Sequence, residues 1–203
     1  MRLRGFPTKR RPTRIVNDTR PISRTGLTAP ERLETKRLVL RRPRPDDAAG
    51  IFERYSSDPD VTRYLSWPRH TALDETRVFL LFSDAEWRQW GCGPYLAFTR
   101  EDGMLIGSTG LAFESVAVAS TGYLLARDAW GRGYATEILH AMTDLARTMA
   151  VGRLYAVCHP DNRASQRVME KCGFTPEGIL KRHTTFPNLG PNRADVLCYA
   201  VEF

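Results

Sequence analysis

The stretch Tyr123-Leu-Leu-Ala-Arg-Asp-Ala-Trp-Gly-Arg-Gly-Tyr-Ala-Thr136 decides the fold. It begins as a short apolar strand and reaches two glycines, Gly131 and Gly133, just before a helical pattern. In that pattern apolar residues recur at steps of three and four, which places them on one helix face. They are Ile138, Leu139, Met142, Leu145 and Met149. Glycines let backbone N–H groups approach a ligand, and a helix N-terminus offers unpaired amides with partial positive charge. The stretch therefore predicts a diphosphate-binding site between Gly131 and Thr136.

Two nucleotide-binding patterns fit this stretch poorly. A Rossmann fingerprint requires a third small residue where Thr136 stands, and an acidic residue about 20 residues later. A P-loop requires Gly-Lys-Ser/Thr, whereas the chain continues Gly133-Tyr134-Ala135. The glycine pair alone is equally compatible with a turn that merely ends a strand.

A second segment, Cys158 to Phe174, has the pattern of a strand end, a polar loop and a short helix. Asp161 or Asn162 is expected to cap this helix at its start. Gly173 is expected to end it, and Phe174 to begin the next strand.

With both segments in view, the sequence resembles the GNAT N-acetyltransferase superfamily. Within it, the chain is similar to the branch that acetylates the N-terminal amines of ribosomal proteins. Trp130-Gly-Arg-Gly-Tyr-Ala135 matches the signature Gln/Arg-x-x-Gly-x-Gly/Ala, with Trp in the first slot as this branch often has. Asn162-x-x-Ser165, followed by Glu170-Lys171-x-Gly173-Phe174, matches the second signature at the usual separation. The resemblance covers residues 31–203.

The resemblance implies a GNAT fold of the α/β (α+β) class. Its central sheet is mixed and mostly antiparallel, is splayed at the cofactor strand, and carries about four helices. The sequence pattern fits this order of elements. Strands are expected at 33–42, 94–99, 105–113, 121–127, 153–158, 174–182 and 196–203, and the two earlier helices at 46–56 and 73–90. We expect one acetyltransferase domain at 31–203, after a disordered basic extension at 1–30.

The net charge of +7 belongs to this extension. Residues 1–30 contain eight basic residues and one acid, so the remainder of the chain is neutral. Four prolines and little apolar periodicity predict disorder there. The extension is interpreted either as a solvated segment, including one added by an upstream start codon, or as an arm that contacts RNA or the ribosome by neutralising phosphates.

The composition fits a cytoplasmic catalytic domain. At 203 residues and 42% hydrophobic, the chain can fill one core. It has no apolar run near the ~20 residues that span a bilayer, and no secretory pattern at its start. The spacing of Cys92, Cys158, Cys172 and Cys198 predicts no metal site and reduced thiols. We expect a monomer or homodimer with no membrane partner.

The resemblance also implies how acetyl-CoA, the acetyl donor, is bound. The main chain of the cofactor strand would pair with the pantetheine amides, at Tyr123, Leu124 and Leu125. The pyrophosphate would lie on the amides of Gly131, Arg132, Gly133, Tyr134, Ala135 and Thr136. Asn162 would bind the pantetheine arm or an ordered water. Without a ligand, the strand residues could equally be paired in a continuous sheet.

Ser165 is the candidate donor of a proton to the leaving thiolate. Many superfamily members use a tyrosine where this chain has Met169, which cannot donate. The alternative for Ser165 is a hydrogen bond to the helix backbone. Glu114 is the candidate general base, although Ser120 stands where the branch often has a glutamate.

Glu177 and His183 are further candidate bases, and a water relay without a dedicated base is an alternative. His159 is expected to shape the loop before Asn162. The acceptor is expected to be a primary amine, namely the α-amine of a protein or peptide. The alternatives are a small-molecule amine (amino acid, polyamine or antibiotic) or a non-catalytic acyl-CoA-binding or RNA-docking module. Trp67-Pro68, the following helix and the loop 184–193 would frame the acceptor groove.

Overall fold

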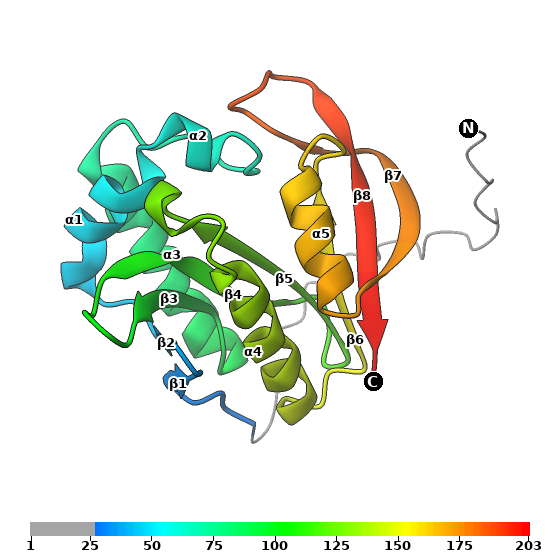
Figure 1. The fold of residues 1–203 in the computed structure, drawn as a ribbon, viewed down its shortest axis with the longest axis horizontal. Coiled ribbons are helices and arrows are strands. Elements are labelled where there is room, and N and C mark those ends of the chain that lie inside the picture. The colour runs from blue at the N-terminus through cyan, green and yellow to red at the C-terminus, as the bar shows by residue number, and fades with distance from the viewer. Residues whose placement is uncertain (1–26) are drawn as a thin grey trace.

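The computed structural model describes residues 27–203, which form a mixed α/β fold with one eight-stranded sheet (Figure 1). The strands are β1 (Arg32–Glu34), β2 (Leu38–Arg41), β3 (Pro94–Thr99), β4 (Leu105–Phe113), β5 (Val118–Leu125), β6 (Arg153–Cys158), β7 (Thr175–Thr185) and β8 (Arg193–Glu202). The α-helices are α1 (Ala48–Ile51), α2 (Pro59–Thr62), α3 (Leu73–Trp90), α4 (Tyr134–Thr148) and α5 (Arg163–Lys171). Three shorter segments are the 3₁₀ turns η1 (Pro45–Asp47) and η3 (Arg127–Ala129) and the π-helical η2 (Phe52–Ser56).

The strand order in the sheet is β1-β2-β3-β4-β5-β6-β8-β7. Every neighbouring pair is antiparallel except β5 and β6, which are parallel. A parallel pair requires a crossover connection, and α4 supplies it. The expected mixed, mostly antiparallel sheet is thus confirmed.

Helices cover both faces of this sheet. α4 and α5 pack against each other on one face, whereas α1 and α3 pack on the other (Figure 1). The apolar stripe predicted for α4 is the face that it buries: Ile138, Leu139 and Met142 are fully buried, and Leu145 and Met149 nearly so. No helix within residues 27–203 has the length and hydropathy to cross a membrane.

Several element boundaries differ from the prediction. The strand expected at 33–42 is split into β1 and β2, because Thr35 closes a turn in which its N–H donates to the Leu38 carbonyl at 2.9 Å. The helix expected at 46–56 changes from 3₁₀ to α to π along its length. The strand before the glycines is 118–125 rather than 121–127.

The folded part also starts before the expected boundary at residue 31. Ala29 is buried, and its N–H donates to the Gly91 carbonyl at 2.8 Å. The Tyr95 hydroxyl donates to the Pro30 carbonyl at 2.7 Å. The basic extension predicted at 1–30 otherwise lies outside the described residues.

Glu137, in the first turn of α4, joins that helix to the β1–β2 turn. Its carboxylate accepts from Thr35 Oγ1 at 2.6 Å, from the Arg37 N–H at 2.8 Å and from Arg37 Nε at 2.7 Å. Arg37 also donates to the Arg132 carbonyl at 2.8 Å and lies over the Tyr134 ring. One carboxylate therefore positions the turn that leads into α4.

The substitution Glu137→Gln is expected to lower the free energy of unfolding at pH 7 by about 1–3 kcal/mol, since it removes charge-assisted hydrogen bonds from a half-buried site. Burial alone would raise the pKa of Glu137, but the hydrogen bonds from Thr35 and Arg37 outweigh burial and lower it. The carboxylate therefore stabilises the fold fully above its unfolded pKa of about 4.3, and less as the pH falls through the lower folded pKa.

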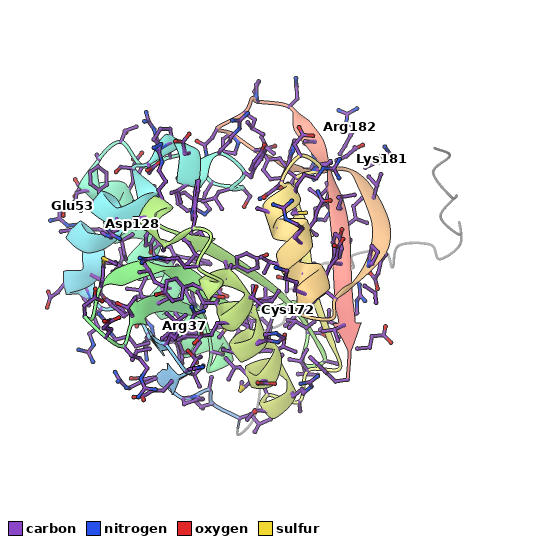
Figure 2. All side chains as sticks on the ribbon, in the orientation of Figure 1. Arg37, Glu53, Asp128, Cys172, Lys181 and Arg182 are labelled. Carbon is purple, nitrogen blue, oxygen red and sulfur yellow. The ribbon has the colours of Figure 1, made fainter. Side chains whose placement is uncertain are left out.

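Urea unfolding between pH 7 and pH 3 tests this expectation, because the difference between wild type and variant should shrink at the acid end. The matched control is Glu53→Gln, at an exposed carboxylate in another part of the molecule (Figure 2). That control should stay within about 0.5 kcal/mol of wild type. A difference for Glu137→Gln that does not change with pH would contradict the assigned role.

Candidate active site

β5 and β6 separate after three residue pairs. The last pair joins Ser120 to Tyr155. Beyond it, β5 stays paired with β4 as far as Leu125, and β6 stays paired with β8 as far as Cys158. Residues 121–125 of β5 therefore have a strand neighbour on one side only, and Figure 1 shows the two strands diverging. The free backbone edge can pair with an extended ligand.

The glycine turn lies between β5 and α4, with both glycines in the left-handed conformation. φ is +75° at Gly131 and +78° at Gly133. A Cβ atom at Gly131 would meet nothing within 4 Å, and one at Gly133 only the Arg37 guanidinium at 3.6 Å. Gly133 is the N-cap of α4, and no side chain caps the start of the helix by a hydrogen bond.

The amides at this turn are open. Within residues 27–203, no hydrogen bond uses an amide of residues 131–136 as its donor. The first helical amide that is paired is that of Glu137, which donates to the Gly133 carbonyl at 3.2 Å. The predicted binding residues Gly131, Arg132, Gly133, Tyr134, Ala135 and Thr136 thus lie on one turn whose unpaired N–H groups and helix dipole suit an anion.

Asn162 begins α5, across the gap from β5. Its side-chain oxygen accepts from the Ser165 N–H at 3.1 Å, so Asn162 rather than Asp161 caps the helix. Gly173 follows the helix with φ of +80°, as expected for a C-terminal glycine. The cap uses the oxygen of Asn162 and leaves its amide nitrogen available to a ligand.

Ser165 lies against Tyr123 of β5. The two hydroxyl oxygens are 3.1 Å apart, and the Tyr123 hydroxyl is 3.2 Å from the Ser165 carbonyl oxygen. Burial raises the pKa of Tyr123, so its phenol stays protonated at neutral pH. The sequence pointed only to the backbone of Tyr123. Met169 is fully buried and cannot donate a proton, so another donor was needed. The phenol of Tyr123 on the cofactor strand was the signal in the sequence that could have identified it.

The structure does not bring Glu114 to this pair. Its carboxylate accepts from the Tyr155 hydroxyl at the closed end of the gap, beside Ser120. Tyr123 lies three residues further along β5, a separation of about 10 Å at ~3.3 Å per residue. Glu114 is therefore remote from Ser165.

The other candidate bases are also placed away from the pair. Glu177 is held by Arg153, with Nη1 to Oε1 at 2.6 Å, and this bond lowers the pKa of Glu177. His183 is exposed on β7. His159 lies between the rings of Tyr64 and Phe186, at centroid distances of 5.1 and 5.0 Å, and its Nδ1 accepts from the Asp161 N–H. His159 thus holds the loop before Asn162.

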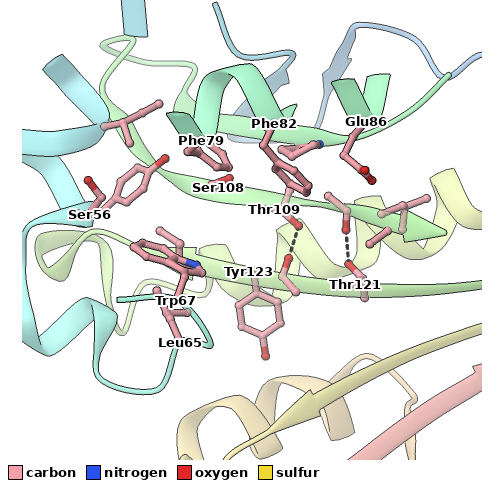
Figure 3. Close-up of a pocket in the computed structure, with 18 of the residues that line it drawn as sticks. Ser56, Leu65, Trp67, Phe79, Phe82, Glu86, Ser108, Thr109, Thr121 and Tyr123 are labelled. Atoms are coloured by element: carbon pink, nitrogen blue, oxygen red, sulfur yellow. Dashed lines mark hydrogen bonds between the residues drawn. The ribbon is translucent and has the colours of Figure 1, made fainter. Parts of the chain in front are cut away.

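A cavity of about 610 Å³ lies on the α1–α3 side of the sheet and reaches the open part of β5 (Figure 3). Its wall is mostly apolar, with Trp67, Phe79 and Phe82 among the lining residues. Tyr123 lines the cavity and also contacts Ser165, so it connects the cavity to the gap. The Tyr55 hydroxyl in the wall is buried and has no hydrogen-bond partner within residues 27–203.

One asparagine joins the two loops predicted to frame the acceptor groove. Asn188 Nδ2 donates to the carbonyls of Trp67 at 2.9 Å and Thr62 at 2.7 Å. Its side-chain oxygen accepts from the Arg69 N–H at 2.8 Å. The β7–β8 loop is therefore fastened to the loop that carries Trp67, and the sequence gave no indication of this contact.

Comparisons with known proteins agree with this geometry. The sequence profile described as "Acetyltransferase (GNAT) domain" matches residues 37–175. The uncharacterized protein YkkB of Bacillus subtilis (strain 168) is 31% identical over 152 residues, which are 73% of this chain and 87% of YkkB. The uncharacterized N-acetyltransferase YoaA of the same organism is 30% identical over 161 residues, 74% of this chain and 86% of YoaA.

Two solved structures are similar in fold and sequence. An acetyltransferase (GNAT family) from Bacillus anthracis has a TM-score of 0.72 and 25% identity, with 84% of this chain and 98% of that chain covered. RimL, a ribosomal L7/L12 α-N-protein acetyltransferase in complex with coenzyme A, has a TM-score of 0.75 and 26% identity, with coverage of 85% and 98%. By these matches the chain belongs to the GNAT acetyltransferase family and is an N-acetyltransferase.

Proposed function

We propose that this N-acetyltransferase moves the acetyl group of acetyl-CoA to the α-amine at the N-terminus of a protein or peptide. The observation that carries the proposal is the set of open amides at residues 131–136 beside the free edge of β5. The two features suit the two parts of coenzyme A, namely a pyrophosphate and a linear arm with amide groups. The similarity to RimL, an α-N-protein acetyltransferase in complex with coenzyme A, supports acetyl-CoA as the donor and a protein α-amine as the acceptor.

In this proposal the chain binds the donor mainly through its backbone. The amides of Gly131 to Thr136 hold the pyrophosphate, and the main chain of Tyr123, Leu124 and Leu125 pairs with the pantetheine arm. The amide nitrogen of Asn162 faces the arm from α5. Acetyl-CoA supplies the activated acetyl group when it is bound. Cys158, Cys172 and Cys198 are buried free thiols, which supports a reducing compartment such as the cytoplasm as the place of the reaction.

Ser165 and Tyr123 supply the proton that the leaving thiolate needs. Either hydroxyl can donate across their 3.1 Å contact, so a proton lost by Ser165 is replaced from Tyr123, and Tyr123 recovers a proton from water, which receives the proton of the amine. The acceptor amine must be neutral to attack, and an α-amine with a pKa near ~8 needs little help at neutral pH. In this proposal its proton passes to water, because the Glu114 carboxylate already accepts a hydrogen bond from the Tyr155 hydroxyl at the closed end of the gap.

A small-molecule amine is the second candidate acceptor. The cavity of about 610 Å³ has the size of a small-ligand site and a mostly apolar wall. Thiol-release assays with N-terminal peptides and with small amines separate the two acceptors. Release with peptides alone would support the α-amine acceptor, and release with small amines alone would overturn it.

The substitution Gly133→Glu is expected to abolish acetyl-CoA binding in a calorimetric titration, because a carboxylate would face the bound pyrophosphate. Gly133→Ala is the matched control, since it shares the backbone strain at φ of +78° without adding charge. The alanine variant should retain most of the affinity, and thermal melting should show both variants folded. Equal affinity of wild type and Gly133→Glu would refute the amide cradle.

The substitution Ser165→Ala is expected to lower kcat by about 100-fold or more while acetyl-CoA affinity stays within a few-fold, because it removes the proton donor. Tyr123→Phe should lower kcat less, since Ser165 remains. The double variant should lower kcat little more than Ser165→Ala alone does, as expected for two groups that act as one unit. Steady-state kinetics and calorimetry measure both quantities. Unchanged kcat in Ser165→Ala would leave the serine with its backbone role only.

A further inference from the structure

The hydroxyl groups that line the 610 Å³ cavity are largely used by the protein itself. Thr109 donates to the Gly122 carbonyl and Thr121 to the Gly110 carbonyl, each at 2.8 Å (Figure 3). Ser108 donates to a strand carbonyl at 3.1 Å. These groups hold β4, β5 and β3 together and add little polarity to the cavity.

The two carboxylates that line the cavity differ in their partners. Glu75 accepts from the N–H groups of Thr71 and Ala72, at 2.5 and 3.2 Å, and so caps α3. Glu86, near the other end of α3, has no hydrogen bond and no ion pair within the described part of the chain.

The charged neighbours of Glu86 are paired with one another. Asp84 lies two residues away and pairs with Arg42 at 2.5 Å and with Arg88 at 2.7 Å. Burial raises the pKa of Glu86, and no nearby charge contributes to that shift. An ionised carboxylate that is half-buried without a partner is stabilised when a cation binds next to it.

The surroundings of Glu86 suit an organic cation rather than a metal ion. Phe82 and Val78, on the same helix, line the cavity and are 55% and 64% exposed, which is high for large apolar side chains. Phe79 and Trp67 add further aromatic surface, which attracts both apolar groups and organic cations (Figure 3). Within residues 27–203, no cluster of three or more metal-ligating side chains occurs.

Glu86 shares this cavity with the free edge of β5. Thr121, Gly122 and Tyr123 form its opposite wall, and Tyr123 contacts Ser165. A cation held at Glu86 therefore lies in the same space as the strand at which we place the acetyl donor.

We propose that Glu86 binds the α-amine of the acceptor as its ammonium ion, and that the apolar wall selects an N-terminal residue with an aromatic or aliphatic side chain. The proposal rests on the proposed function and names its acceptor class. The bound ammonium first loses one proton to water and becomes the neutral amine. Its nitrogen then forms a bond to the acetyl carbon as the carbon–sulfur bond of acetyl-CoA breaks; the nitrogen releases its second proton to water, the leaving thiolate takes a proton from Ser165, and the product amide carries no charge. The ion pair with Glu86 is then lost, so the product is released more readily than the substrate.

Binding of 2-phenylethylamine and of 2-phenylethanol, its neutral analogue, tests this inference by calorimetry at pH 7. No acetyl donor is added, so the result does not depend on catalysis. The alkylamine, with a pKa near ~10, is charged at this pH. Wild-type protein should bind the amine at least about tenfold more tightly than the alcohol. Glu86→Gln should bind both compounds with similar affinity.

Asp84→Asn is the matched control, because it removes one negative charge from the same helix outside the cavity. It should keep the preference for the amine. Equal affinities of wild type for both compounds, a preference that survives Glu86→Gln, or binding of neither compound would each overturn the inference. Titration of acetyl-CoA into wild type and Glu86→Gln separates the two proposals, since donor affinity should be the same in both proteins.

Discussion

The short parallel pairing of β5 with β6 is the constraint on which the site depends. Only residues 118–120 pair with β6, and each strand then follows its antiparallel neighbour. A parallel pair needs a crossover, so the chain must leave β5 and return through α4. The N-terminus of α4 therefore lies at the open end of the gap, beside backbone that has lost a partner. Both the free edge and the open amides follow from this one interruption of the sheet.

Much of the fold could be predicted from local pattern. The boundaries of α3, β3, β4 and β6 agree with the expected ranges 73–90, 94–99, 105–113 and 153–158. These elements have clear periodicity and strong turn signals at their ends. The split between β1 and β2 could not be predicted, because Thr35-Lys36-Arg37 contains no glycine, proline or asparagine. That turn is stabilised by Glu137, a residue about 100 positions away, as well as by its own hydrogen bonds.

Some features of the site could likewise be predicted from local sequence, whereas others depend on contacts between distant residues. The glycine turn and the Asn162 cap are local features, so the residue types at those positions were sufficient to predict their conformation. The contact of Tyr123 with Ser165 spans 42 residues, and that of Asn188 with Trp67 spans 121. No pattern of sequence spacing predicts either contact. Glu86 belongs to the same class, since only the structure shows that Asp84 is paired and Glu86 is not.

The charges at the two ends of the proposed reaction path have opposite signs, and this difference bears on specificity. The helix N-terminus and open amides at residues 131–136 favour an anion, whereas Glu86 favours a cation. α4 and α5 cover one face of the sheet. The Glu86 cavity is lined by α3 on the other face, so the two proposed ligands would approach from different sides. An acidic group brought to Glu86 would meet a carboxylate without a counter-ion, which penalises acceptors with a negative charge near the amine. Repulsion by Glu86 and attraction by the amides of residues 131–136 would thus keep the anionic donor out of the acceptor cavity without a conformational change.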